Sequence, residues 1–159
     1  ALRLANVYGP GPTASGAGRG VFNLMIQRAL QGEVLKVYGH SRLLRDYIFV
    51  DDVARAFLQA GAHMEAVTGK FFVIGSGRGE SIGDAVKLVA ERTARKTGRQ
   101  VNVSHLPPPE GSLAIEHRNF VADTTRFRLT TGWKPEVSLE EGIDRTIDHY
   151  REQAQVGRV

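Results

Sequence analysis

A strand that leads directly into a helix is encoded at residues 45–56, which read RDYIFVDDVARA. The apolar run at 47–50 predicts a short buried strand. Apolar residues then recur at the spacing of one helix face: Val53, Ala56, Phe57 and Ala60. Asp51 or Asp52 is the expected N-cap, because an aspartate side chain accepts hydrogen bonds from the unpaired N–H groups of a first helical turn.

Strands and helices alternate along the rest of the chain. Apolar runs predict strands at 2–6, 35–38, 71–74 and 101–105, and apolar periodicity predicts helices at 22–30, after Ser81, after Asp123 and after Ser138. Ser81 and Ser138 each precede an acidic residue by three positions, which is the spacing of a capping box. The continuous run at 71–74 indicates a strand buried on both faces of a parallel sheet. The fold class is therefore predicted to be α/β.

Composition narrows the classes of protein to which the chain can belong. With 159 residues, of which 42% are hydrophobic and 24% charged, the chain is long and apolar enough for one globular domain. No apolar run approaches the roughly 20 residues that cross a bilayer, so no membrane span is expected. The absence of cysteine excludes disulfides and fits a cytoplasmic protein. Ala1 directly precedes an expected strand, which suggests a fragment of a longer chain.

Several kinds of active site find no support in the sequence. Residues 75–80, GSGRGE, follow a strand and precede a helix, but Glu80 stands where a dinucleotide loop needs its third glycine, so we expect a plain turn. The five histidines are scattered without metal-ligand spacing, so no metal site is expected. The stretch from Gly9 to Gly20, rich in Gly, Pro, Ser and Thr, is expected to be a long mobile loop.

The net charge of +4 suits an anionic partner, although such an excess also serves solubility alone. Four arginines lie in loop-forming sequence where a phosphate could approach: Arg19, Arg45, Arg78 and Arg118. Taken singly, each is better explained as a solvated surface residue. Tyr38 could contact a nucleobase as part of the wall of a binding pocket, or it could simply pack in the core. The 21 basic residues are spread among 17 acidic ones, so a nucleic-acid partner is not expected.

Three motifs together resemble the extended short-chain dehydrogenase/reductase family, whose members act on nucleotide sugars. They are NVYGP at 6–10, the stretch at 45–56, and TGWKPEVSLEEG at 131–142. The resemblance implies the C-terminal part of an extended Rossmann-type enzyme, with a few mostly parallel strands and a small helical substrate-binding lobe. It covers nearly all of residues 1–159, as the nucleotide-sugar-binding portion, with the N-terminal cofactor-binding half absent.

The resemblance also implies which residues bind the substrate, a nucleoside-diphosphate sugar. They are Asn6, Asn23, Leu24, Val37, Tyr38, Arg45 and Arg118. In such enzymes the residue matching Asn6 contacts the sugar or its diphosphate, and the arginine matching Arg45 clamps the diphosphate. The strand containing Val37 and Tyr38 frames the base with its backbone. The chain departs from the family at Val73, where asparagine is frequent.

In this family NAD or NADP binds a G-x-x-G-x-x-G loop, and a Tyr-x-x-x-Lys pair carries the chemistry. Neither motif occurs here. We therefore expect no catalytic residue in this chain and no cofactor binding by it alone. The parent would be an epimerase, dehydratase, reductase or decarboxylase, for which a homodimer is one expectation. The alternatives are a non-catalytic nucleotide-binding module and one half of a split enzyme.

Overall fold

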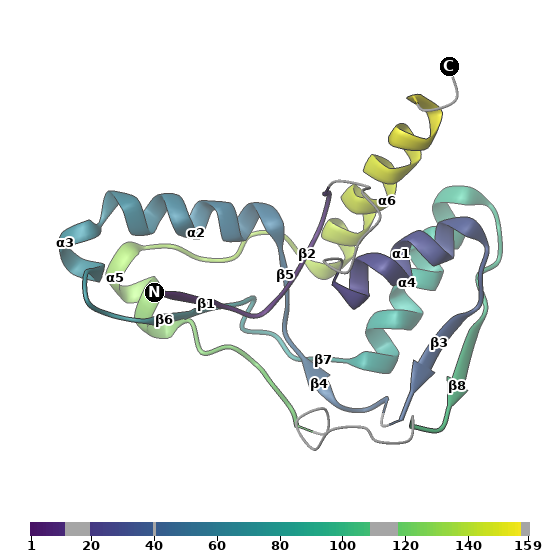
Figure 1. The fold of residues 1–159 in the computed structure, drawn as a ribbon, viewed down its shortest axis with the longest axis horizontal. Coiled ribbons are helices and arrows are strands. Elements are labelled where there is room, and N and C mark those ends of the chain that lie inside the picture. Colours follow the sequence, from purple (N-terminus) through teal and green to yellow (C-terminus); the bar gives the residue numbers. More distant parts are fainter. Residues whose placement is uncertain (12–19, 40, 109–117, 157–159) are drawn as a thin grey trace.

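A computed structural model describes residues 1–11, 20–39, 41–108 and 118–156 (Figure 1). The expected mobile loop from Gly9 to Gly20 lies mostly outside these ranges, and so does Arg19. The described chain forms two lobes that are joined by a central pair of parallel strands. In that pair, β2 (Asn6–Tyr8) runs beside β5 (Tyr47–Phe49), with Asn6 opposite Tyr47 and Tyr8 opposite Phe49.

One lobe contains the N-terminus and is drawn on the left of Figure 1. Its strands β1 (Leu2–Leu4) and β6 (Phe72–Ile74) are parallel, and three helices lie around them: α2 (Val50–Ala62), α3 (Met64–Val67) and α5 (Thr125–Thr131). The other lobe pairs β3 (Leu35–Tyr38) in parallel with β8 (Val103–Leu106) and packs three helices together: α1 (Val21–Gln31), α4 (Ile82–Thr97) and α6 (Leu139–Val156).

A short antiparallel ladder lies between the lobes. β4 (Leu44–Arg45) pairs with β7 (Glu80–Ser81), so that Arg45 is opposite Glu80. The prediction of an α/β fold with mostly parallel strands is confirmed, because three of the four described strand pairs are parallel.

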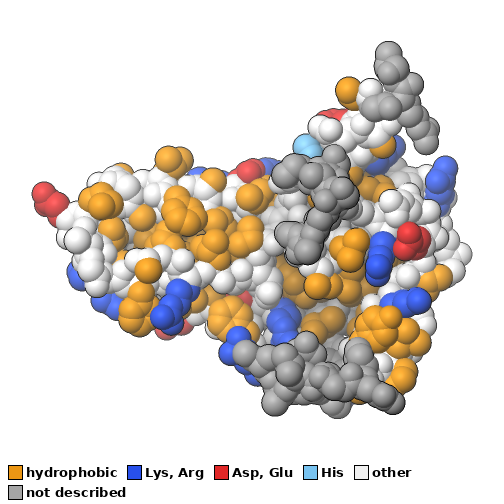
Figure 2. All heavy atoms as spheres, viewed as in Figure 1, with side chains coloured by type: hydrophobic (Ala, Val, Ile, Leu, Met, Phe, Trp, Pro, Cys, Tyr) orange, Lys and Arg blue, Asp and Glu red, His pale blue; other side chains and the backbone are white. Residues whose placement is uncertain are grey.

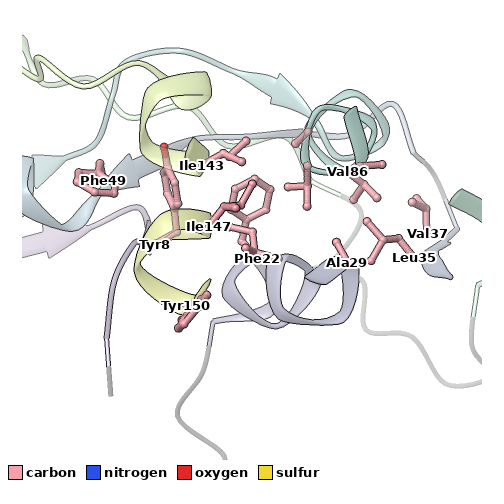
Figure 3. Packing of buried hydrophobic residues seen from close by; sticks show 14 residues of the cluster. Tyr8, Phe22, Ala29, Leu35, Val37, Phe49, Val86, Ile143, Ile147 and Tyr150 are labelled. Atoms are coloured by element: carbon pink, nitrogen blue, oxygen red, sulfur yellow. The ribbon is translucent and has the colours of Figure 1, made fainter. Parts of the chain in front are cut away.

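Each lobe has its own apolar core. The larger core lies among α1, α4 and α6, and Figure 3 shows Tyr8, Phe22, Ile143 and Ile147 within it. The Tyr8 ring meets Phe22 and Phe49 edge to face, with centroids 5.1 and 5.6 Å apart. In the smaller core the ring of Phe127, from α5, meets the rings of Phe72 and Trp133 edge to face. Contacts of this kind add about 0.5–1.5 kcal/mol each beyond the area that they bury.

Hydrophobic side chains also remain on the surface, and Figure 2 shows many of them over the lobe that holds α2, α3 and α5. The large exposed ones in this lobe include Phe57, Leu58, Met64, Phe71 and Leu129. No helix in the described part of the chain is long and apolar enough to cross a membrane.

The local helix signals hold where they depend on nearby residues. The Ser81 hydroxyl accepts the N–H of Asp84 at 3.0 Å, and the Ser138 hydroxyl accepts the N–H of Glu141 at 3.2 Å, as both capping patterns predict. Gly32 and Gly132 end α1 and α5 in the left-handed conformation that glycine adopts without strain.

Other sequence predictions were wrong in detail. Phe49, not Asp51 or Asp52, is the N-cap of α2, and Phe57 is 54% exposed, so it is not part of the buried stripe. The N-cap of α5 is Thr124, although the Asp123 carboxylate still accepts the N–H of Thr125 at 2.9 Å.

The strands differ from the predictions as well. The strand expected at 2–6 is divided into β1 and β2, which pair with different partners. Phe71 precedes β6 and is 54% exposed, so the run at 71–74 is only partly buried.

Candidate functional site

A hollow of about 370 Å³ opens where the start of α1 faces β2 and the end of β4. Its walls are largely apolar, with one guanidinium, one carboxamide and one phenol: Asn6, Val7, Gly20, Val21, Phe22, Met25, Arg45, Tyr47 and Ile82. The parallel register of β2 with β5 places Asn6 opposite Tyr47 and therefore beside Arg45. The fold thus brings together two of the substrate residues predicted from the sequence, although 39 positions separate Asn6 and Arg45 in the chain.

The Arg45 side chain is held at the edge of this hollow by backbone oxygens. Nη1 donates to the carbonyl of Leu44 at 2.9 Å and to the carbonyl of Arg118 at 2.5 Å. A guanidinium is planar, always charged and donates hydrogen bonds in a fixed plane, which are the properties that suit it to a phosphate. Arg118 therefore contributes to the site through its carbonyl, while its side chain is not among those lining the hollow.

Asn6 is held equally firmly. Its Nδ2 donates to the carbonyl of Asp46 at 2.9 Å, and its backbone N–H donates to the same oxygen at 3.1 Å. Because the amide nitrogen is fixed, the orientation of the Oδ1 acceptor is fixed too. A ligand in the hollow would therefore meet a carboxamide and a guanidinium that are both placed in advance.

Asp46 was not singled out from the sequence, yet it organises this region. Its carboxylate is fully buried and accepts four hydrogen bonds: from the N–H and hydroxyl of Ser76, both at 2.7 Å, and from the N–H groups of Gly77 and Ala122, both at 3.0 Å. A Cβ at Gly75 would lie 2.6 Å from Oδ2 of Asp46, so only glycine permits this approach. The glycine-rich loop at 75–80, predicted to be a plain turn, therefore binds the carboxylate of Asp46 with its backbone N–H groups.

This loop bears directly on cofactor binding. Dinucleotide loops hold a pyrophosphate with backbone N–H groups. Here the N–H groups of Ser76 and Gly77 already bind Asp46. The described residues of this loop thus do not fit a nicotinamide dinucleotide.

The remaining predicted residues lie at varying distances from the hollow. Asn23 points back along the chain, where its side chain accepts the N–H of Gly9 at 3.1 Å and donates to its carbonyl at 3.0 Å. The N–H of Leu24 is used within α1. Val37 is in the core, and Tyr38 is half exposed at the end of β3. Contact of any of these residues with a ligand stays a prediction.

Tyr47 is a second residue that sequence reasoning missed. Its ring stacks on Phe22 with centroids 4.5 Å apart. Tyr47 lines the hollow beside Arg45 and also a neighbouring one of about 230 Å³ that includes Arg78 and Glu80. Burial raises the pKa of Tyr47 to about 12, against the opposing pull of the Arg45 charge, and Glu80 raises it further. Its hydroxyl is therefore neutral at physiological pH and can donate a hydrogen bond.

The described ranges contain no group of three or more His, Cys, Asp or Glu side chains that could hold a metal ion. The hollow offers groups suited to binding: one cation, amide and phenol groups, and apolar walls. Such a combination suits a ligand that has both a flat apolar part and a compact anionic part.

The chain is similar in sequence and fold to several known proteins. Residues 1–75 match the NAD dependent epimerase/dehydratase family. A UDP-glucose 4-epimerase from Mycolicibacterium smegmatis is 34% identical over 151 residues, which are 95% of this chain and 45% of that protein. A dTDP-L-rhamnose 4-epimerase from Burkholderia thailandensis is 32% identical over 145 residues, which are 89% of this chain and 37% of that protein.

Among solved structures, a UDP-glucose 4-epimerase from Thermotoga maritima, determined with UDP-glucose, superposes with a TM-score of 0.78 at 35% identity. The match covers 96% of this chain and 46% of that one. The chain thus spans less than half the length of these relatives, and its fold is part of a Rossmann-type epimerase fold. The chain therefore matches the NAD dependent epimerase/dehydratase family, in line with its resemblance to the extended short-chain dehydrogenases/reductases.

Proposed function

We propose that this chain is the nucleotide-sugar-binding portion of an NAD(P)-dependent epimerase, dehydratase or reductase. Its role is to anchor the nucleoside diphosphate of the sugar in the hollow beside Arg45. In this proposal residues 1–159 are the C-terminal portion, and the cofactor-binding half is supplied by residues outside this sequence. The similarity to epimerases of UDP- and dTDP-linked sugars supports this ligand class.

The observation that carries the proposal is the presence of Asn6 and Arg45 in one hollow with apolar walls. A diphosphate needs a cation that keeps its charge and donates in a fixed plane, which describes Arg45. A nucleobase needs flat apolar surface, which Phe22 and Met25 offer in the same hollow. Asn6 adds a polar group of fixed orientation, which suits a ribose or sugar hydroxyl.

Binding and chemistry are divided in this proposal. The chain lacks the Tyr-x-x-x-Lys pair and the G-x-x-G-x-x-G loop, and its own glycine-rich loop is used by Asp46. Its contribution to a reaction is therefore to hold one end of the substrate while the sugar is presented to another part of the enzyme. Binding energy of this remote kind is what positions a reacting group.

Calorimetric titration of UDP into the 159-residue chain tests the assignment. Arg45→Ala should weaken binding by about 1.5–3 kcal/mol, the range for a hydrogen bond to a charged group, or roughly 10- to 150-fold in Kd. Arg95→Ala removes an exposed arginine of α4 that does not line the hollow and should leave Kd unchanged. Equal affinities of Arg45→Ala and the unmodified chain would refute the assignment.

The gene provides a separate test of the division between two halves. Upstream of the codon for Ala1 we expect codons for a G-x-x-G-x-x-G loop and, closer to Ala1, for a Tyr-x-x-x-Lys pair. A start codon at that position would instead favour one half of a split enzyme or a non-catalytic nucleotide-binding module.

A further inference from the structure

Asp46 lies between Arg45 and Tyr47, two residues that line the hollow, but it has no exposed surface and so cannot touch a ligand. We propose that Asp46 is a positioning residue for Arg45: its carboxylate joins the segments that aim the guanidinium into the hollow. This inference rests on the proposed function, since it concerns how the same site takes a diphosphate.

The first segment joined by Asp46 is the loop after β6. Ser76 donates both its N–H and its hydroxyl to Oδ1, and Gly77 donates its N–H to Oδ2. This loop leads into β7, where Glu80 pairs with Arg45 across the antiparallel ladder. The carboxylate therefore fixes one side of the strand from which Arg45 projects.

The second segment, residues 118–122, flanks the same strand. Ala122 donates its N–H to Oδ2 of Asp46 at 3.0 Å. A few residues earlier, the carbonyl of Arg118 accepts the Nη1 of Arg45 at 2.5 Å, and Oδ1 of Asn119 accepts the N–H of Leu44 at 2.8 Å. The segment is thus held by the Asp46 carboxylate at one end and holds the guanidinium at the other.

The main chain of Asp46 has a third part in the same arrangement. Its carbonyl accepts both the N–H and the Nδ2 of Asn6. Asn6 is thus held by the main chain of Asp46, which a change of the Asp46 side chain leaves in place, whereas the support of Arg45 comes from the carboxylate. The fully hydrogen-bonded carboxylate makes this support rigid, because the buried charge would be left unsatisfied in any other arrangement.

Two substitutions disturb this support without touching the hollow. Asp46→Asn keeps the shape but removes the charge, and its NH₂ group would face N–H donors of Ser76, Gly77 or Ala122. Ser76→Ala removes one hydrogen bond to Oδ1 and leaves Asp46 in place. Asp144→Asn makes the same chemical change as Asp46→Asn at a carboxylate of α6 that binds Arg92, so it is the matched control.

The test is a titration of each variant with UDP and, separately, with uridine, which lacks phosphates. We expect Asp46→Asn to raise the Kd of UDP about 5-fold or more, because small misplacement of a positioning group is costly. Ser76→Ala should raise it by a smaller factor of about 3. The Kd of uridine should change less than about 2-fold in both, and Asp144→Asn should change neither value by more than that.

Coupling to Arg45 separates positioning from general loss of structure. In the Arg45→Ala background, adding Asp46→Asn or Ser76→Ala should cause no further loss of UDP affinity, since the group they position is gone. If Arg45→Ala itself has no effect on UDP, the proposed function fails. If Arg45→Ala weakens UDP binding but Asp46→Asn and Ser76→Ala do not, or if their effects add to that of Arg45→Ala, the positioning role is refuted. If Asp46→Asn does not fold, Ser76→Ala decides by the same criteria.

Discussion

The hydroxyl of Tyr8 packs directly against the backbone of Gly142 in the first turns of α6, and donates to the carbonyl of Leu139 at 3.3 Å. A Cβ at Gly142 would overlap with that hydroxyl and would lie 2.8 Å from Cδ2 of Phe49. The end of the central strand β2 can therefore reach α6 only because position 142 has no side chain.

Gly142→Ala should destabilise the chain even though alanine is the better helix former. The overlap should cost about 1–3 kcal/mol, more than the roughly 1 kcal/mol that the propensity gains. Gly61→Ala in α2 has open space around its Cβ and should be neutral or slightly stabilising. Urea unfolding followed by the fluorescence of Trp133, the single tryptophan, measures both. A Gly142→Ala variant as stable as Gly61→Ala would show that β2 and α6 do not pack in this way.

Tyr47 should make the chain sensitive to alkali. Burial raises its folded pKa from 10.0 to about 12, so between these values the unfolded chain loses a proton that the folded chain retains. The stability that the buried phenol of Tyr47 contributes is therefore fully present below pH 10 and declines as pH rises toward 12. The free energy of unfolding of Tyr47→Phe, measured over this window, should fall less steeply than that of the unmodified chain. Parallel slopes would contradict the burial of the phenol.

The sequence predicted features that depend on neighbours within a few positions. Ser81 with Asp84 and Ser138 with Glu141 cap their helices as expected, because the donor and acceptor lie in the same turn. The glycine at 132 ends its helix for the same local reason. Such features require no knowledge of the tertiary structure.

What could not be predicted depends on contacts between distant segments. The pairing of β4 with β7 joins residues 35 and 37 positions apart through two-residue strands, which carry no periodic signal. Asp46 binds backbone N–H groups 30 to 76 positions away, and any residue type can supply such a group. Asn6 and Arg45 were identified as site residues through the family resemblance. The sequence around Tyr47 indicates only an apolar strand and gives no sign that its side chain lines the hollow.

The ion pair between Arg92 of α4 and Asp144 of α6 should contribute to the free energy of unfolding, and this contribution should be lost at low pH. The hydrogen bond from Arg92 lowers the pKa of Asp144, so the contribution is present above the ordinary carboxyl pKa and is lost as pH falls through the lowered value. Both side chains are about a quarter exposed, so we expect Asp144→Asn to cost only about 0.5–1 kcal/mol near pH 7.

Unfolding measurements at descending pH check this contribution. The difference between Asp144→Asn and the unmodified chain should shrink as pH falls below the ordinary carboxyl pKa of about 3.9 and should vanish once Asp144 is protonated in the folded chain. A difference that persists unchanged in acid would mean that the asparagine acts through packing and not through the lost charge.

The adjacent aspartates Asp51 and Asp52 should respond very differently to the same substitution. Asp52 is fully buried, and its carboxylate accepts the N–H groups of Glu136 and Val137 at 2.9 and 3.1 Å, besides pairing with Arg55. Asp51 is exposed and faces Arg145 at 3.5 Å. Asp52→Asn places an NH₂ group against backbone donors in a buried position, which should cost about 2–4 kcal/mol.

Asp51→Asn is the matched control and should change the free energy of unfolding by less than about 0.5 kcal/mol. Trp133 reports on the same contact, because its Nε1 donates to the carbonyl of Asp52 at 3.0 Å. In Asp52→Asn the segment at 133–137 should be held less firmly. A soluble quencher should therefore quench the fluorescence of Trp133 more strongly, even before global unfolding. Equal stabilities of the two variants would show that the buried carboxylate does not hold this segment on α2.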